Sequence, residues 1–328
     1  MIISRSPFRL TLGGGGTDLK SYYEKNGGFI FSCAINKYMY VTINKPVIDN
    51  KIRIKYSRSE TVSSLKYIKH EIAKTCLEKM GIRNSIEIVS MADIPAGTGF
   101  GSSSCYTVGL LNSLHALKRN FISLQDLAEE ACAIEIDILK KSIGKQDQYI
   151  TTFGGFTVLN IDKKGKVKVR NANIKKSTIN ELRKNLLIFY TGKTRSNDKI
   201  MNDQNKNTVN KNKQTIASLD YIKESGKEIL RLFEKGDISD LGNMFHSHWF
   251  YKKKLSDHIS SKKFDRIYDA AIESGADGGK ISGAGGGGFF VFYCNENHAS
   301  VRQKMIKMGL RELEYDFDYE GTKIVTNY

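Results

Sequence analysis

The chain has 328 residues and a formal net charge of +16, from 51 Lys and Arg against 35 Asp and Glu. This length suffices for a substantial core and for two domains. No stretch reaches the ~18 consecutive apolar residues of a membrane-spanning helix, and residues 1–5 become polar too early for a signal peptide. We therefore expect a cytoplasmic protein with no membrane partner.

The positive charge raises the question of a nucleic-acid partner. The lysines are scattered along the chain, and they are neither gathered in one basic helix nor interleaved with aromatic residues as a stacking platform requires. We therefore expect no nucleic-acid partner, although the positive field favours anionic small molecules. Five cysteines lack any C-x-x-C spacing and are interpreted as free thiols: Cys33, Cys76, Cys105, Cys132 and Cys294.

Residues 2–9, 29–35 and 38–43 are rich in strand-forming side chains. Apolar residues at helical spacing predict a helix over 65–80 that stops at Gly81. Alternating apolar residues in 86–91 then predict a strand that leads into a glycine-rich loop.

The next elements alternate between helix and strand. A helix is predicted over 105–118, and a second one, capped by Ser123, extends to Ile138. A strand at 153–161 follows, and the turn at 163–165 ends it.

A second domain is expected to begin between residues 165 and 185, which gives an N-terminal domain of 1–175 and a C-terminal domain of 176–328. The polar stretch 193–213 is compatible with either an exposed helix or a mobile flap. The other elements predicted in this half are strands at 187–190 and 289–293 and helices at 215–234, 239–249, 262–274 and 297–308.

The segment 95–104 (PAGTGFGSSS) is the most informative part of the chain. Its glycines allow tight turns and close approach to a bound group, and it opens into a helix whose first N–H groups favour a phosphate. The spacing fits neither a Walker A loop nor a dinucleotide fingerprint. The candidate phosphate-binding residues are Pro95, Gly97, Gly99, Gly101, Ser102, Ser103 and Ser104.

Glycine clusters recur at 13–16 and at 283–288. The three segments, in this order, resemble the signatures of the GHMP small-molecule kinases, with Phe100 where the middle motif usually has Leu. The resemblance implies an α+β, two-lobed GHMP kinase fold: an N-terminal lobe like ribosomal protein S5 domain 2 and a ferredoxin-like C-terminal lobe. It also implies ATP as co-substrate, together with Mg²⁺.

The resemblance further implies the catalytic residues. Asp147 lies in Gly-Lys-Gln-Asp-Gln (144–148), which is similar to the family's G-x-D segment with one extra residue. Arg9 falls where the family has a cation opposite its aspartate. A carboxylate beside a cation stays ionised and can accept a proton from a hydroxyl.

For the metal, the resemblance points to Ser103 and to Glu135 in the following helix. Glu130 and Asp137 remain competing candidates for the acidic ligand. The histidines, including His246 and His248, lack a third partner at ligand spacing and are assigned no site.

Asp18 stands where galactokinase has its sugar-binding aspartate, but glycines replace two bulky polar residues before it. This departure argues against galactose and resembles the branch that contains heptose 7-phosphate kinases and fucokinases. The basic loop after the strand at 187–190 could hold a phosphate already on the substrate. The candidate substrate-binding residues are Gly15, Gly16, Thr17, Asp18, Lys193, Arg195, Gly285 and Gly286.

The expected reaction is transfer of a phosphoryl group from ATP to the anomeric hydroxyl of D-glycero-D-manno-heptose 7-phosphate, which gives the 1,7-bisphosphate used for nucleotide-heptose synthesis. Another GHMP sugar kinase, such as a fucokinase, and a non-catalytic sugar- or nucleotide-binding relative are the alternatives. The expected partners are the sugar phosphate and ATP, with a homodimer as one possible assembly.

Overall fold

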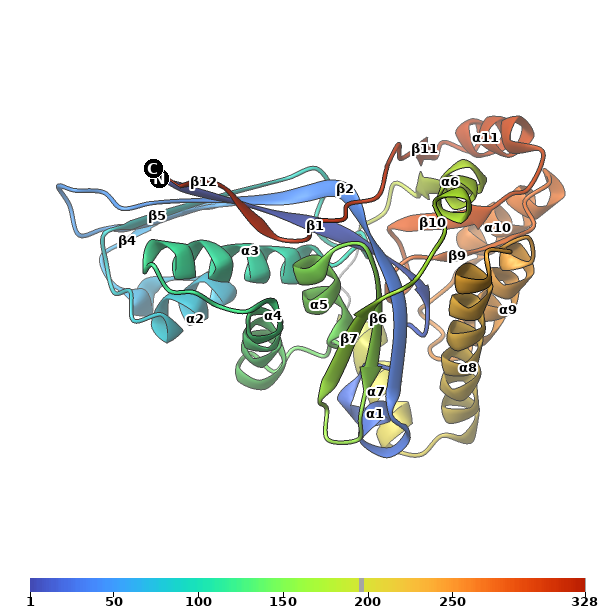
Figure 1. The fold of residues 1–328 in the computed structure, drawn as a ribbon, viewed down its shortest axis with the longest axis horizontal. Helices are drawn as coiled ribbons and strands as arrows, with labels where there is room; N and C mark the ends of the chain where they lie inside the picture. The colour runs from blue at the N-terminus through green and yellow to red at the C-terminus, as the bar shows by residue number, and fades with distance from the viewer. Residues whose placement is uncertain (195–197, 328) are drawn as a thin grey trace.

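The computed structural model describes residues 1–194 and 198–327. It has two lobes, each with its own β-sheet, and the first and last strands of the chain lie side by side at the far end of the larger lobe (Figure 1). The predicted α+β class is confirmed.

The larger sheet is built on two long strands. β1 (Ile2–Gly13) runs antiparallel to β2 (Gly28–Asn44), whose first half also pairs with β6 (Phe156–Ile161) and whose second half pairs with β5 (Ile86–Ala92). The two strands predicted at 29–35 and 38–43 are thus one continuous strand. The register shifts between Pro7 and Phe8, so residues 36 and 37 form an irregularity that does not end it.

The chain returns to this sheet at its end. β12 (Lys323–Asn327) pairs antiparallel with β1, so the last strand lies in the N-terminal sheet, although the sequence places it in a domain of 176–328. The shorter strands of this sheet are β3 (Ile52–Lys55), β4 (Ser59–Val62) and β7 (Val167–Asn171).

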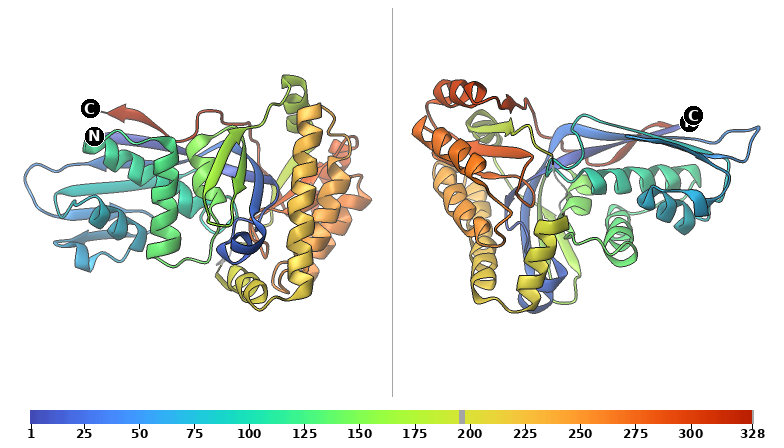
Figure 2. Two further views of the ribbon diagram at one scale, coloured as in Figure 1. Left: turned by 60° about the horizontal axis from the view of Figure 1, so that its bottom comes forward. Right: turned by 180° about the vertical axis from the view of Figure 1, so that it is seen from behind.

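Helices cover one face of the larger sheet, as the turned views show (Figure 2). The buried helix α3 (Ser102–Leu117) packs against β1 and β2 and starts three residues before the predicted helix. The predicted helix over 65–80 is divided into a single turn, η1 (Leu65–Tyr67), and α2 (Glu71–Lys79). The helix predicted from Ser123 to Ile138 is α4 (Leu124–Cys132) followed by a π-helical turn, η2 (Ala133–Ile138). Three helices were not expected: α1 (Lys20–Asn26) and α5 (Gln146–Phe153) in this lobe, and α6 (Lys176–Asn185) in the smaller lobe.

The smaller lobe has an antiparallel sheet with strand order β11-β8-β10-β9, which is the order of a ferredoxin-like fold. Its strands are β8 (Leu186–Tyr190), β9 (Gly278–Ile281), β10 (Phe289–Tyr293) and β11 (Arg311–Glu312). Its helices are α6 (Lys176–Asn185), α8 (Lys213–Lys235), α9 (Leu241–Lys253), α10 (Lys262–Glu273) and α11 (His298–Lys307).

Within the polar stretch 193–213 the structure shows a helix, α7 (Asp198–Val209). One face of this helix is buried, because Ile200, Gln204 and Thr208 are almost inaccessible to solvent. It packs near α1 of the larger lobe and also bonds to the smaller lobe, where the Ser256 hydroxyl donates to Asp203 Oδ2 at 3.0 Å.

The two lobes share packing at their junction. Phe100 is fully buried and stacks on Phe289, with ring centroids 4.6 Å apart, so the aromatic residue that departs from the family motif fills the space between the lobes.

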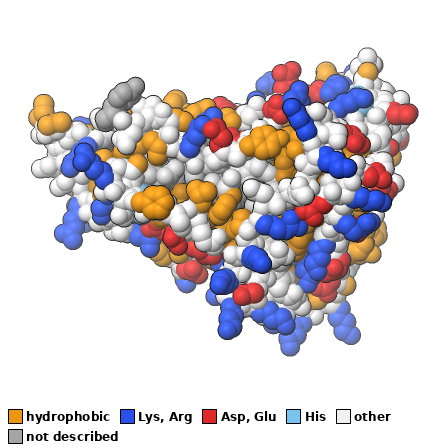
Figure 3. All heavy atoms as spheres, viewed as in Figure 1, with side chains coloured by type: hydrophobic (Ala, Val, Ile, Leu, Met, Phe, Trp, Pro, Cys, Tyr) orange, Lys and Arg blue, Asp and Glu red, His pale blue; other side chains and the backbone are white. Residues whose placement is uncertain are grey.

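On the face in Figure 3, Lys and Arg side chains are interspersed with Asp and Glu rather than gathered in one stripe. In the part of the chain that the structure describes, no helix is long and apolar enough to span a membrane.

Candidate active site

The glycine-rich loop at 95–104 has a backbone that only glycine adopts readily. Gly97, Gly99 and Gly101 have φ angles of 77°, 88° and 84°, and Gly101 is the residue that precedes α3. The start of α3 therefore has no side chain at Gly97, Gly99 or Gly101 beside its first N–H groups. This arrangement suits a phosphate group.

The third glycine cluster packs directly on this loop. A Cβ on Gly99 would lie 2.6 Å from the Ser282 carbonyl oxygen, and a Cβ on Gly288 would lie 1.9 Å from that of Thr98. The Ser282 hydroxyl also donates to the Gly99 carbonyl at 3.3 Å. The cluster thus positions the loop through backbone contacts between the lobes.

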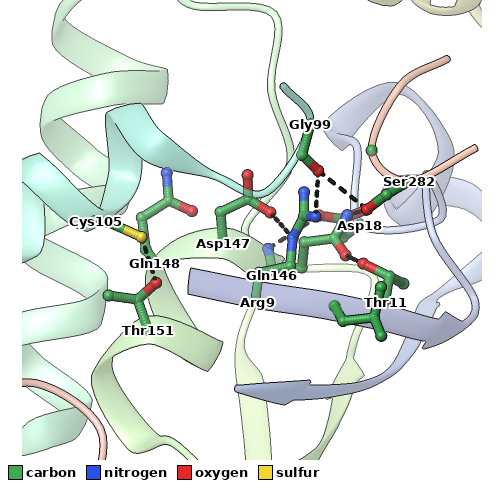
Figure 4. Close-up of polar contacts among 12 residues, drawn as sticks. Arg9, Thr11, Asp18, Gly99, Cys105, Gln146, Asp147, Gln148, Thr151 and Ser282 are labelled. Carbon is green, nitrogen blue, oxygen red and sulfur yellow. Dashed lines mark hydrogen bonds and ion pairs between the residues drawn. The ribbon is translucent and has the colours of Figure 1, made fainter. Parts of the chain in front are cut away.

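Arg9 and Asp147 meet beside this loop (Figure 4). Arg9 Nε lies 2.6 Å from Asp147 Oδ1, and Arg9 Nη1 donates to the Gly99 carbonyl at 2.7 Å. The Arg9 side chain, from β1, is only 5% exposed, while the Asp147 carboxylate, in the first turn of α5, is 20% exposed. The structure therefore brings the two predicted catalytic residues together, with the carboxylate facing open space.

Two pockets meet at Asp147. The first, which we call the loop pocket, is lined by residues 95–97 and by the three serines at 102–104. The second, the interlobe pocket, lies between the lobes, and Asp18 lines it from the larger lobe. Both pockets are lined by the same four residues, which are Gly99, Gly101, Ile143 and Asp147.

The loop pocket has an aromatic end that the sequence did not reveal. Tyr56, His70 and Tyr106 line it, with ring centroids 4.6 Å apart for the first pair and 4.8 Å for the second. The first pair of rings is edge-to-face, at 87°, and the second is tilted, at 40°. An aromatic cluster at one end and a glycine-rich loop that suits a phosphate at the other are compatible with a nucleotide. No motif marks Tyr56 or His70, because they come from separate segments of the chain.

Ser103 and Glu135 form the predicted metal pair. The Ser103 hydroxyl donates to Glu135 Oε1 at 2.6 Å, and Gln148 Nε2 donates to Glu135 Oε2 at 2.8 Å. Lys141 Nζ donates to Ser103 Oγ at 3.0 Å and lies 3.6 Å from Glu135. Hydroxyl and carboxylate oxygens are the ligands that Mg²⁺ takes in proteins, so this pair fits the ion.

The competing acidic residues are placed less well. Glu130 Oε2 lies 2.7 Å from His115 Nε2 and accepts its hydrogen, and Asp137 is exposed at the surface. Glu135 instead lies fully buried in the π-helical turn η2, a local irregularity that is frequent at functional sites.

Asp18 is fixed by N–H groups around the interlobe pocket. Its Oδ2 accepts from the Gln146 backbone N–H at 2.9 Å, and its Oδ1 accepts from the Gly16 N–H at 3.2 Å. Burial raises the pKa of Asp18 to about 6. The hydrogen bond from the Gln146 backbone lowers this pKa, and the negative charge of Asp147 raises it. A Cβ on Gly144 would lie 1.9 Å from Asp18 Oδ2, so this position requires glycine.

Two neighbours of Asp18 were missed by the sequence. Thr11 Oγ1 donates to Gln146 Oε1 at 2.7 Å, and both side chains line the interlobe pocket with Asp18. Figure 4 shows this group beside the Arg9–Asp147 pair. Alternation along β1, which places Arg9 and Thr11 on one face, is the signal that could have indicated Thr11.

The structure places four predicted substrate-binding residues outside the lining of the interlobe pocket. The Thr17 hydroxyl lies 2.8 Å from the carbonyl oxygens of both Gly14 and Phe29, so it supports the loop. The other three residues contact other parts of the smaller lobe. Lys193 Nζ lies 6.0 Å from the Phe264 ring centroid. Both glycines contact Ile259: a Cβ on Gly285 would meet it, and the Gly286 N–H donates to its carbonyl at 2.7 Å. Arg195 lies outside the described residues.

The smaller lobe contributes other residues to the interlobe pocket. His248 and Lys252 from α9 and Lys280 from β9 line it, and Met201 and Gln204 from α7 close one side. Gln204 Nε2 donates to the Gly16 carbonyl at 3.4 Å. His248 and Lys252 are four residues apart, so they share one face of α9. The sequence could not indicate them, because this spacing does not tell which face of the helix meets the pocket.

Two family models match the chain: the GHMP kinases N terminal domain over residues 66–155 and the GHMP kinases C terminal model over residues 229–309. D-glycero-alpha-D-manno-heptose 7-phosphate kinase of Campylobacter jejuni is 28% identical over 336 aligned residues, which cover 98% of this chain and 97% of that protein.

Two solved structures share the whole architecture. A D-glycero-D-manno-heptose 1-phosphate kinase from Bacteroides thetaiotaomicron superposes with a TM-score of 0.83 at 24% identity over 100% of both chains. A putative sugar kinase from Campylobacter jejuni superposes with a TM-score of 0.79 at 26% identity, over 98% of this chain and 97% of that one. With both family models matched in order on this fold, the chain belongs to the GHMP kinase family.

Proposed function

We propose that the chain transfers the γ-phosphoryl group of ATP to the anomeric hydroxyl of a sugar phosphate, namely D-glycero-D-manno-heptose 7-phosphate. The observation that carries this proposal is the position of Asp147, which lines both the loop pocket and the interlobe pocket. A phosphoryl donor in one pocket and an acceptor in the other would meet at this carboxylate. The similarity to a heptose 7-phosphate kinase over almost the full chain supports the choice of sugar.

Asp147 acts as the proton acceptor in this proposal. Arg9 holds its Oδ1 at 2.6 Å and leaves the second carboxylate oxygen for the acceptor hydroxyl. The bond between the acceptor oxygen and the γ-phosphorus forms while the bond to the bridging oxygen of ATP breaks, and the hydroxyl proton passes to the carboxylate. The products are ADP and the sugar bisphosphate.

The phosphates of ATP would lie on the N–H groups at the start of α3. Ser103 and Glu135 would hold Mg²⁺, which neutralises charge on the phosphates. Asp18 and Gln146 would orient the sugar hydroxyls, since both line the interlobe pocket. Retention of Asp147, Arg9 and Ser103 argues against a non-catalytic relative.

An ADP-release assay with a panel of acceptors tests the proposal. We expect kcat/KM for the heptose 7-phosphate to exceed that for the unphosphorylated heptose, L-fucose and galactose by about tenfold or more, a free-energy difference that one charged contact supplies. Phosphorus NMR of the product should show the new phosphate coupled to the anomeric proton. Higher kcat/KM for L-fucose would overturn the proposal in favour of a fucokinase.

A further inference from the structure

Lys141 lies against the two residues that would hold Mg²⁺. Its Nζ donates to Ser103 Oγ at 3.0 Å and lies 3.6 Å from Glu135 Oε1. These two oxygen atoms also bond to each other, since the Ser103 hydroxyl donates to Glu135 Oε1 at 2.6 Å. The ammonium group of Lys141 and a divalent cation would therefore need the same oxygen atoms.

The oxygen atoms of this pair have few lone pairs to spare. A hydroxyl has one hydrogen and two lone pairs, and Ser103 gives its hydrogen to Glu135 and one lone pair to Lys141. Glu135 Oε2 accepts from Gln148 Nε2 at 2.8 Å. A divalent cation on the remaining lone pairs would lie beside the ammonium group, and like charges this close repel each other. We therefore expect that the two cations do not bind the pair together.

Glu135 needs one of the two cations. Its side chain is 0% exposed, and a buried carboxylate without a counter-charge is unfavourable. Lys141 supplies this charge from a side chain that is 29% exposed. Because the stem of a lysine is flexible and this one reaches solvent, its ammonium group can leave the carboxylate once another cation balances it.

The backbone keeps Lys141 in this place. The Lys141 N–H donates to the Glu135 carbonyl at 2.9 Å, and the Ile143 N–H donates to the Lys141 carbonyl at 2.9 Å. Lys140, the preceding residue, has a φ angle of 53°, in the left-handed region that non-glycine residues seldom adopt. Ile143 lines both the loop pocket and the interlobe pocket. This turn therefore ties Lys141 both to Glu135 and to a residue at the junction of the two pockets.

We propose that Lys141 neutralises Glu135 until Mg²⁺ and ATP bind, and that its ammonium group then moves to the phosphates of ATP. This inference rests on the metal site of the proposed function. Ser103, on which the ammonium group lies, is in the first turn of α3 and lines the loop pocket, so the phosphates would be next to the displaced group. Lysine binds phosphate as a mobile point charge.

Metal binding in the absence of nucleotide tests the exchange. Mn²⁺ is the probe, because it takes the same oxygen ligands as Mg²⁺ and its free ion is counted by electron paramagnetic resonance. Lys141→Met removes the ammonium group, so its Kd for Mn²⁺ should be lower than that of the wild type by about tenfold or more. Lys140→Met is the matched control, since Lys140 is the preceding residue and is exposed. Its Kd for Mn²⁺ should stay within about twofold of the wild type.

Thermal unfolding covers the case in which the lost charge destabilises the protein. Without metal, Lys141→Met should unfold at a lower temperature than the wild type. Mn²⁺ should raise its midpoint more than that of the wild type, because tighter binding to the native state stabilises it more. Lys141→Arg keeps a cation and should keep the weak Mn²⁺ binding of the wild type.

A crystal structure with Mg²⁺ and a non-hydrolysable ATP analogue tests where the ammonium group goes. Lys141 Nζ should lie within about 3.2 Å of a phosphate oxygen and no longer bond to Ser103. An ammonium group that stays on Ser103 and Glu135 beside the metal would overturn the proposal, as would equal Kd values for Mn²⁺ in Lys141→Met and the wild type.

Glu135→Gln combined with Lys141→Met separates the possible failures. This double variant should lose the gain in Mn²⁺ affinity. If it keeps the gain, the ion binds elsewhere, and the metal site of the proposed function is wrong together with this inference. None of these measurements uses an acceptor sugar, so a wrong choice of sugar in the proposed function would leave their results unchanged.

Discussion

Replacing Asp147 by asparagine isolates its role as a proton acceptor. The asparagine carbonyl oxygen can still accept from Arg9 Nε, which lies 2.6 Å from Asp147 Oδ1, so the shape of the site is kept. The change removes the negative charge and the basic oxygen. A positioned general base contributes about 10²- to 10⁴-fold to a rate, so kcat is expected to fall by that factor.

The same substitution also has a cost in stability, which sets the control. Arg9 is 5% exposed, and without the carboxylate it keeps only a neutral acceptor and the Gly99 carbonyl. Weakening a partly buried ion pair in this way is expected to lower the free energy of unfolding by about 1–3 kcal/mol. Affinity for ATP should be unchanged or slightly higher, because one negative charge near the phosphates is lost.

The assay is ADP release at saturating ATP and sugar phosphate, with thermal unfolding to confirm the fold and calorimetry for ATP binding. Asp126→Asn is the matched control, since Asp126 also lies in the first turn of a helix of the larger lobe, and among the described residues its side chain bonds only to Ser123. A folded Asp147→Asn enzyme with kcat within about threefold of the wild type would refute the reasoning.

Three further predictions concern the metal and two buried charges. Glu135→Gln is expected to raise the Mg²⁺ concentration for half-maximal rate about tenfold, and an unchanged Mg²⁺ titration would place the ion elsewhere. Because burial raises the pKa of Asp18 from 3.8 to about 6, the protein loses stability as the pH rises through 6, in all about 3 kcal/mol. Asp18→Asn should therefore stabilise the protein more at pH 8 than at pH 5, by roughly 1 kcal/mol, in chemical denaturation; a difference independent of pH would contradict this. Burial lowers the pKa of Lys280 to about 7, so its positive charge is lost above that pH. Because Lys280 lines the interlobe pocket, the KM for the sugar phosphate is expected to rise between about pH 6.5 and 8.5. A KM that stays constant over this range would contradict the prediction.

The sequence was sufficient where function depends on contiguous residues. The glycines of 95–104 have the positive φ angles that their spacing implies, and Ser103 stands at the start of α3. Arg9 and Asp147 were paired through a resemblance, and the structure brings them within 2.6 Å. The resemblance that these motifs support also implied the two-lobed fold.

The sequence was insufficient where the two lobes meet. His248, Lys252 and Lys280 come from a helix and a strand far from the N-terminal motifs, and periodicity alone gives a helical face without its neighbour. Thr17 differs in the opposite way, since its place in a glycine motif suggested a ligand contact while its hydroxyl donates to the Gly14 and Phe29 carbonyls. The helix α5 was missed because it has only eight residues.

The backbone contact between the two glycine loops is expected to couple the binding of the two substrates. Ser282 and Gly283 line the interlobe pocket, and both also press on Gly99, where a Cβ on Gly283 would lie 2.5 Å from the Gly99 carbonyl oxygen. A ligand that shifts either loop is expected to shift the other, since the close contacts at Gly99 are with backbone atoms of Ser282 and Gly283. Each substrate is then expected to change the dissociation constant of the other by the same factor, as reciprocal linkage demands.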